Sequence, residues 1–339
     1  MKKNIIPLIA MMLSLSVFLP ACEKKNNNES ATLASSSDIS SIMNDDNDLM
    51  QQSSGGMSCG YQDADIESLT YSGEDVSVPY YIESTDENNG SDVSIGLLIF
   101  VDGEVQPFRV EDNDKNGEEE SMHIFHMKSG EKKKFNILFT PINGKKDETI
   151  GFLPVTVWNP EYQPGKSDNS SFGNTYETMS NVPLPLHMKK STEAKTTETS
   201  VKIKYTDIPE KIKDQYEGTE LGDTFDAIDA SPNLEIESKN SRVEMKEDGS
   251  VDLTFNAYGG AQITRKMTVF VNNQPVKIDN GDYVKYRVKK NKMCQIKVKL
   301  DKAKVSDGDV IYAIAVDTGK DYRLGVELLG GPILVTNGD

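Results

Sequence analysis

The stretch FVDGEVQPFRV at Phe100–Val110 matches the stretch FVNNQPVKI at Phe270–Ile278 when a gap of two residues is allowed. The match extends upstream and downstream with its order and spacing kept. The further matched segments are Val76–Tyr80 with Val251–Phe255, Phe135–Phe139 with Ile296–Leu300, Asp147–Phe152 with Asp307–Tyr312, and Pro183–Leu186 with Pro332–Val335. Self-similarity of this kind indicates two copies of one structural unit.

Apolar residues inside the matched segments recur at every second position. Val284, Tyr286 and Val288 alternate with basic residues, and Ile296, Val298 and Leu300 do the same. This period is typical of antiparallel strands with one buried face. Asp102-Gly103 and Asn272-Asn273 are hairpin-turn signals between such runs. The pattern therefore predicts an all-β fold of two tandem immunoglobulin-like antiparallel β-sandwiches.

The amino-terminal segment predicts export and lipidation. Residues 4–19 form a short apolar run after Lys2 and Lys3, and Leu19-Pro20-Ala21-Cys22 reads as a bacterial lipobox. The run is too short to span a bilayer, so a cleaved signal peptide is the better interpretation. Cys22 would carry the acyl chains, and two or more chains give stable anchoring. We therefore expect attachment to the cell membrane on its extracellular side.

Composition divides the rest of the chain. We expect a signal peptide at 1–21, a disordered tether rich in Asn, Ser and Asp at 22–57, a first sandwich at 58–190, and a second at 233–339. Residues 191–232 read as a linker, in which Val201–Tyr205 is a candidate last strand of the first sandwich and Pro209–Ile228 a turn or two of helix.

The lipobox and several motifs of the first unit resemble uncharacterised surface lipoproteins of Gram-positive (Firmicutes-type) bacteria with tandem immunoglobulin-like domains. The motifs are Val101-Asp102-Gly103 with Gln106, Met122-His123, Phe139-Thr140-Pro141 and Gly144-Lys145-Lys146-Asp147. The resemblance implies a surface-anchored β-rich protein and carries no known activity or site residues.

The charge is negative and unevenly spread. The chain has a formal net charge of -17, and residues 22–232 hold 18 Lys and Arg against 39 Asp and Glu, whereas residues 233–339 hold 17 against 15. An acidic surface repels phosphate backbones, so nucleic acid is not an expected partner.

Four aromatic residues are candidates for ligand binding. Trp158 ends a strand, and Tyr162, Phe172 and Tyr176 follow it in a stretch rich in Pro, Gly, Ser and Asn. Exposed rings on such a loop would stack on sugar rings or anchor a protein partner. The alternative is that all four rings cover the core.

Two charged clusters are further candidates. Lys285, Arg287, Lys289, Lys297 and Lys299 would share one outer face if their strands pair as a hairpin, and would then meet an anionic polymer or lipid headgroups. Asp112, Asp114, Asn116 and Glu118 reproduce the first half of a calcium loop, although its twelfth position is His123. The alternative is that the basic cluster is a solvated face and that the acidic cluster is a solvated hairpin. A structural calcium ion is the one cofactor that the sequence leaves open.

The cysteine and histidine residues do not predict a disulfide, a metal site or a catalytic site. Cys59 and Cys294 lie in different halves and read as unpaired thiols. His123 and His126 are three apart on a strand and face opposite sides. No motif for a serine nucleophile, a zinc peptidase or a phosphate loop is found in the sequence.

These observations predict a cell-surface lipoprotein that acts as a non-catalytic binding or adhesion module for an extracellular glycan, wall component or protein. The alternatives are a secreted hydrolase that uses loop carboxylates and a structural spacer or accessory subunit. A solute-binding lipoprotein fits less well, because that class alternates strands with helices.

Overall fold

The computed structural model describes residues 51–54, 56–63, 65–85, 92–112, 115–166, 171–193, 195–219 and 222–337. Cys22, the predicted signal peptide and most of the predicted tether lie outside them. The first described strand, β1 (Gln51–Ser54), forms a hairpin with β2 (Met57–Tyr61). The last residues assigned to the tether therefore belong to the first sandwich, because Met57 and Cys59 enter its core.

Strands make up 51% of the structure and helices 8%, which places the protein in the all-β class. The first sandwich consists of two sheets. One has the order β1-β2-β4-β10-β7-β8, with β4 Val76–Ser84, β10 Lys132–Phe139, β7 Arg109–Asp112 and β8 Lys115–Asn116. The other has the order β3-β13-β11-β5-β6, with β3 Leu69–Tyr71, β13 Leu184–Met188, β11 Thr149–Trp158, β5 Val93–Val101 and β6 Glu104–Val105. Here β9 (Met122–Met127) pairs with β5, and β12 (Thr178–Ser180) with β11.

The second sandwich repeats this plan. One sheet has the order β14-β21-β17-β15, with β14 Ile203–Asp207, β21 Lys292–Leu300, β17 Val251–Tyr258 and β15 Asn233–Ile236. The other has the order β16-β23-β22-β18-β19, with β16 Arg242–Met245, β23 Glu327–Asn337, β22 Val310–Asp317, β18 Thr264–Val271 and β19 Gln274–Val276. Here β20 (Val284–Arg287) pairs with β18.

The first sandwich has the strand order of immunoglobulin folds, with a four-strand A-B-E-D arrangement facing a sheet centred on G-F-C. In the second sandwich the A, B and E strands and the G-F-C sheet keep these places, and β14, which precedes strand A in the chain, stands in the place of strand D. Each sandwich also has one parallel pair at the same edge, β3 with β13 and β16 with β23. The predicted duplication and fold class are therefore confirmed.

One segment of the sequence alignment is wrong by one residue. Because Val101 pairs with Phe152 and Val271 pairs with Ile311, Phe152 is equivalent to Ile311 and not to Tyr312. The shift matters because alternate residues of a strand face opposite sides. Phe152 and Ile311 fill the cores of their own sandwiches, whereas Tyr312 faces outward.

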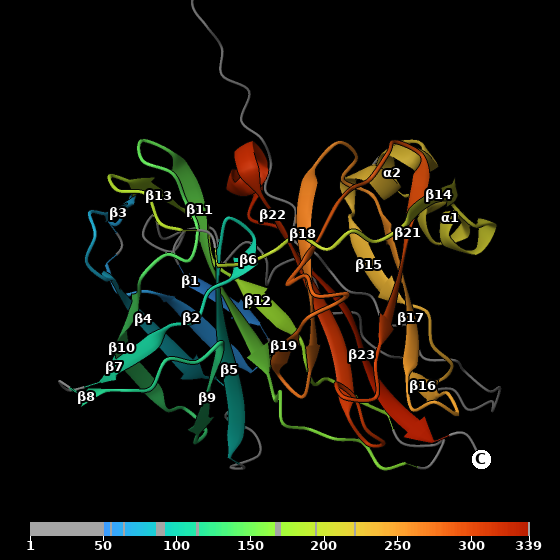
Figure 1. Cartoon of the computed structure of the whole chain (residues 1–339), viewed down its shortest axis with the longest axis horizontal. Helices are drawn as coiled ribbons and strands as arrows, with labels where there is room; N and C mark the ends of the chain where they lie inside the picture. Colours follow the sequence, from blue (N-terminus) through green and yellow to red (C-terminus); the bar gives the residue numbers. More distant parts are fainter. Residues whose placement is uncertain are drawn as a thin grey trace, which may run out of the picture. The chain divides into compact units, whose positions relative to one another are not determined.

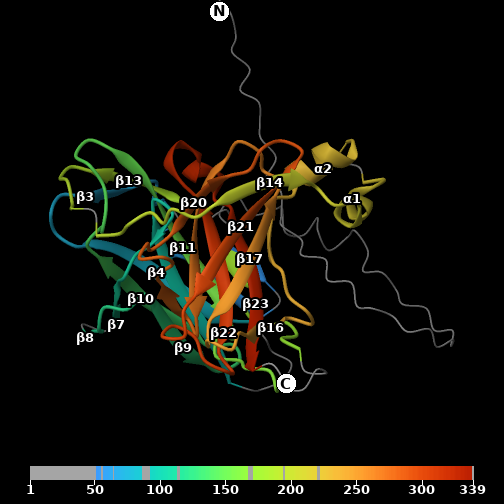
Figure 2. The same cartoon turned by 45° about the vertical axis from the view of Figure 1, so that its right-hand side comes forward.

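The predicted linker is a structured connection. It includes α1 (Glu210–Tyr216) and α2 (Thr224–Ala230), which confirms the expected helical turns. Its strand β14 does not close the first sandwich as predicted but pairs with β21 of the second, as Figure 2 shows. There β14 takes the edge that β7 occupies in the first sandwich, because residues 277–283, all of them described, add no strand to that sheet.

The facing sheets of the two sandwiches pack against each other. The outward side chains of β5 and β11 form one buried apolar cluster with those of β18 and β22, and Figure 1 shows these strands side by side. Every residue of β5 and β22 is buried. Strands buried on both faces read as continuous apolar runs, which distinguishes them from the alternating strands elsewhere in the chain.

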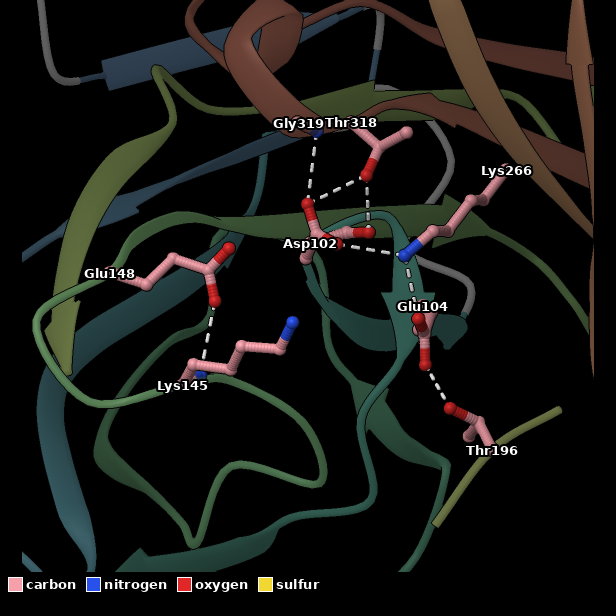
Figure 3. A network of polar contacts seen from close by, with 8 residues as sticks. All are labelled: Asp102, Glu104, Lys145, Glu148, Thr196, Lys266, Thr318 and Gly319. Atoms are coloured by element: carbon pink, nitrogen blue, oxygen red, sulfur yellow. Dashed lines mark hydrogen bonds and ion pairs between the residues drawn. The ribbon is translucent and has the colours of Figure 1, made fainter. Parts of the chain in front are cut away.

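A polar network borders this apolar cluster (Figure 3). The ammonium of Lys266 lies 2.6 Å from a carboxylate oxygen of Glu104 and 2.8 Å from one of Asp102. Asp102 also accepts hydrogen bonds from the Thr318 hydroxyl (2.7 Å) and the Gly319 amide (3.0 Å). Burial alone would raise the pKa of Asp102, but the attraction of Lys266 and the hydrogen bonds from Lys266, Thr318 and Gly319 together outweigh it, and the pKa is lowered. The network thus joins charged groups of both sandwiches.

No helix in the described part of the chain combines the length and the apolar character needed to cross a bilayer.

Candidate functional site

The structure separates the four candidate aromatic residues. Tyr162 is 41% exposed, and Trp158 is half-buried against the first core. Phe172 and Tyr176 are 7% and 1% exposed, and both belong to the cluster between the sandwiches. Two of the four predicted binding rings are therefore unavailable to a ligand, because the second sandwich covers the loop that carries them.

Tyr162 borders an open groove of about 370 Å³ at one end of the first sandwich. The start of β5, the end of β9 and the loop after β11 form its walls. Its lining residues are Asp92, Val93, Ser94, His126, Asn159, Glu161 and Tyr162. The volume falls in the range of small-molecule sites, which is about 300–1,000 Å³.

The polar side of the groove is fixed by strand register and by one turn. His126 stands opposite Ser94 in the pairing of β9 with β5, and its Nε2 lies 2.7 Å from a carboxylate oxygen of Glu161. Asn159 has a positive φ of 45° and exchanges two hydrogen bonds with the backbone of Ser94, at 2.8 and 3.1 Å. These bonds turn the chain sharply after β11 and bring Glu161 beside His126.

The ring of Tyr162 is held by its neighbours, although the residue is 41% exposed. Its hydroxyl donates to the carbonyl of Ser171 (3.1 Å), and Phe172 meets it edge-on with ring centroids 6.4 Å apart. The hydroxyl of Tyr176 donates to the Tyr162 carbonyl (3.1 Å). A fixed, partly exposed ring beside hydrogen-bonding side chains suits a ligand with both apolar and hydroxylated faces.

The predicted basic face does not form. Strand β20 pairs with β18, whereas β21 pairs with β17 and β14, so the two strands belong to opposite sheets. Lys285 and Arg287 therefore lie on one sheet and Lys297 and Lys299 on the other. Lys289 follows β20, with its ammonium 4.0 Å from the centre of the Tyr205 ring. The prediction is wrong because the turn after β20 crosses between the sheets instead of closing a hairpin.

The candidate calcium loop is a β-hairpin. Asp112 of β7 pairs with Lys115 of β8, Glu111 pairs with Asn116, and Glu118 is exposed. Asp114 lies outside the described residues. Where the structure describes the chain, no three His, Cys, Asp or Glu side chains gather in a way that could hold a metal ion. A calcium loop requires its oxygens to converge, whereas among the described residues Asp112 and Asn116 lie on the paired strands of a hairpin.

Cys59 and Cys294 are both free and buried, as predicted. Burial raises the pKa of Cys59 to about 11 and that of Cys294 to about 12. Because the thiolate is the reactive form, neither cysteine is suited to nucleophilic chemistry at neutral pH.

Asp92, His126 and Glu161 are not predicted to be neighbours from the sequence, because three separate segments contribute them. The contact between the sandwiches is not predicted either. The available signal was the continuous apolar run SIGLLIFV at Ser94–Val101, together with VIYAIAV at Val310–Val316. Apolar runs in which polar residues do not occupy every second position indicate strands that are covered on both faces.

A scan against models of known protein families finds no match to this chain, and a search of curated proteins finds no similar sequence.

Proposed function

We propose that the protein is a surface lipoprotein, anchored through Cys22 to the extracellular side of the membrane, and that its docked sandwiches form a non-catalytic module that binds a glycan. The groove beside Tyr162 would be the contact site. The lipobox supports the location, and the docked pair of sandwiches supports a rigid module rather than two independent ones.

The observation that carries the proposal is the exposed, fixed ring of Tyr162 in the groove. Only Tyr162 and Leu324 are large hydrophobic side chains with wide exposure in the described residues. A sugar ring has an apolar face that stacks on an aromatic ring, and its hydroxyls would reach Asn159, Glu161 and His126. The ionisable side chains of the groove include Asp92 and Glu161, and the whole chain carries a net charge of -17. A neutral oligosaccharide therefore fits better than an anionic polymer.

Replacing Tyr162 with alanine is expected to lower the affinity for the best-binding neutral hexasaccharide at least about tenfold, which corresponds to about 1.4 kcal/mol. Tyr162→Phe should keep most of the affinity, because the stacking ring remains. Calorimetry with a panel of cellohexaose, mannohexaose and chitohexaose measures both. Leu324→Ala is the matched control, since it removes the other exposed hydrophobic side chain.

Equal affinity of wild type and Tyr162→Ala would contradict the proposed site. Release of shorter sugars from any panel member would instead favour the hydrolase alternative. In that case Asp92→Asn and Glu161→Gln should abolish the release, because both carboxylates line the groove.

A further inference from the structure

We infer that the second sandwich positions the groove of the first: it holds the described parts of the loop between β11 and β12, residues 159–166 and 171–177, in the form that presents Tyr162. The second sandwich is then a support for one binding site and not a second binding module. The inference depends on the proposed function only in what it says about ligand affinity.

The most direct contact is a hydrogen bond across the interface. The side-chain amide of Asn273, in the turn between β18 and β19, donates to the carbonyl of Pro160 at 3.0 Å. Pro160 stands between the groove residues Asn159 and Glu161. The Tyr312 hydroxyl donates to the Asn273 side-chain oxygen at 3.1 Å and so fixes which end of the amide faces Pro160. Asn273 is 7% exposed, so water does not compete freely for these bonds.

A line of tyrosines connects the second sandwich to the exposed ring. Tyr312 stacks on Phe270, with centroids 4.9 Å apart, and contacts Tyr176 of the loop at 5.4 Å. Tyr176 in turn donates its hydroxyl to the carbonyl of Tyr162. Phe172, edge-on to both Tyr162 and Tyr176, is buried in the same cluster. The apolar underside of the loop therefore rests on residues of the second sandwich.

The loop is also held further from the groove. The guanidinium of Arg242 donates to the Gly165 carbonyl at 3.1 Å, and Lys166 forms an ion pair with Asp307. Both Arg242 and Asp307 belong to the second sandwich. Contacts from the second sandwich thus reach the segment before residue 167 and the segment after residue 170.

In the second sandwich, the position that corresponds to the groove is filled by residues of the first sandwich. The backbone bond from Asn159 to Ser94 has its equivalent in the bond from Thr318 to Thr264. At Thr318, however, the turn of the first sandwich fills the space: Asp102 accepts from Thr318, and a β-carbon on Gly103 would lie 3.1 Å from that of Thr318. The equivalent turn, Asn272-Asn273, reaches only the Pro160 carbonyl and leaves the groove open. The two sandwiches therefore contact each other through equivalent turns, but the groove stays open on the first sandwich.

Asn273→Gly tests the inference against the matched control Asn272→Gly. Both positions have positive φ, 67° and 47°, so glycine fits the backbone at each. Asn272 bonds only to Asp309 and Val310 within the second sandwich. Tyr176→Phe is the second variant, because it removes only the hydroxyl that holds the Tyr162 carbonyl.

Hydrogen exchange of the full chain gives a readout that needs no ligand. The amides of Tyr162 and Tyr176 donate to Asn159 and Trp158, so they report on loop order. We expect Asn273→Gly and Tyr176→Phe to speed their exchange about tenfold or more while β4 and β17 keep wild-type protection, and to weaken binding of the best-binding hexasaccharide by a similar factor. Asn272→Gly should leave loop exchange and affinity unchanged.

Unchanged loop exchange in Asn273→Gly, or an equal increase in Asn272→Gly, would overturn the inference, whatever Tyr176→Phe does, because the Tyr176 hydroxyl bonds within the loop itself. Faster loop exchange in a protein that binds none of the hexasaccharides would contradict the proposed function and still support the positioning role.

Discussion

Replacing Lys266 with alanine is expected to lower the free energy of unfolding by about 3–5 kcal/mol, because the change leaves the buried carboxylate of Glu104 and the half-buried one of Asp102 without their cation. Lys266 is 6% exposed and Glu104 is 5% exposed. The ammonium contacts Glu104 and Asp102 and lies 4.9 Å from the centre of the Tyr283 ring. Its pKa is raised, since attraction to the two carboxylates outweighs the effect of burial. Lys266 is therefore charged at neutral pH and balances groups of the first sandwich.

Lys285→Ala is the matched control for Lys266→Ala. Lys285 pairs with Lys266 across β20 and β18, but it is exposed and has no role in the network. Its replacement should change stability by less than about 0.5 kcal/mol. Chemical denaturation measures both variants. A loss below about 1 kcal/mol for Lys266→Ala would contradict the assignment of this network to the contact between the sandwiches.

Raising the pH from 5 to 8 is expected to destabilise the folded protein, with Glu327 as the main cause. Glu327 begins β23, and its carboxylate accepts a hydrogen bond from the Ser180 hydroxyl of the first sandwich. Burial raises its pKa from 4.5 to about 7, and the nearby Asp317 adds to the effect. Burial also raises the pKa of Asp317 to about 6, although Arg265 opposes the shift. Both groups thus hold protons in the folded chain that the unfolded chain releases.

The sign of the effect follows from proton binding. Between pH 4.5 and 7 the folded state binds more protons at Glu327 than the unfolded state does, so stability falls as pH rises. The part of the loss that comes from Glu327 should approach about 3 kcal/mol at most and should level off above pH 7.5 or so, and Asp317 adds to it. Thermal unfolding from pH 5 to 8 measures it. Glu327→Gln should flatten the curve, and a wild-type stability that rises over this range would contradict the assignment.

Alternating apolar residues were sufficient to predict the sandwiches, because a half-buried strand needs one apolar and one wet face. The hairpin turns Asp102-Gly103 and Asn272-Asn273 were predictable for a similarly local reason: Asn, Asp and Gly tolerate positive φ. All four residues have it in the structure. These features depend on neighbours in the chain, which a sequence displays directly.

The arrangement of the sandwiches depends on contacts between residues far apart in the chain, and the sequence pattern did not predict it. From the sequence, Phe172 and Tyr176 are candidates for exposed loop aromatics, whereas in the structure the second sandwich covers them. Lys285 and Lys299 are predicted to share one face, whereas β20 and β21 belong to different sheets. Arg265 occupies the position that Ile95 holds in the first sandwich, yet it is fully buried and paired with Asp317 at 2.9 Å. Such pairs cannot be inferred from periodicity, because a buried charge breaks the pattern that locates the core.

Of the residues that line the groove, only Tyr162 was a candidate from the sequence. Tyr162 was identified as a candidate because an aromatic residue on a polar loop stands out. Its partners His126 and Asp92 were not, because strand register places His126 opposite Ser94. A correct register for β9 and β5 would have located them.

An engineered disulfide tests the docking of the two sandwiches most directly. A β-carbon on Gly103 would lie 3.1 Å from the Thr318 β-carbon, and disulfides need about 3.5–4.5 Å. Gly103 also has a φ of 76°, so the turn must shift for a cysteine to be accepted there. The account predicts that Gly103→Cys with Thr318→Cys forms an intramolecular bond on mild oxidation, identified by peptide mapping, and that neither single variant does. Two reduced, titratable thiols in the folded, oxidised monomer would contradict it.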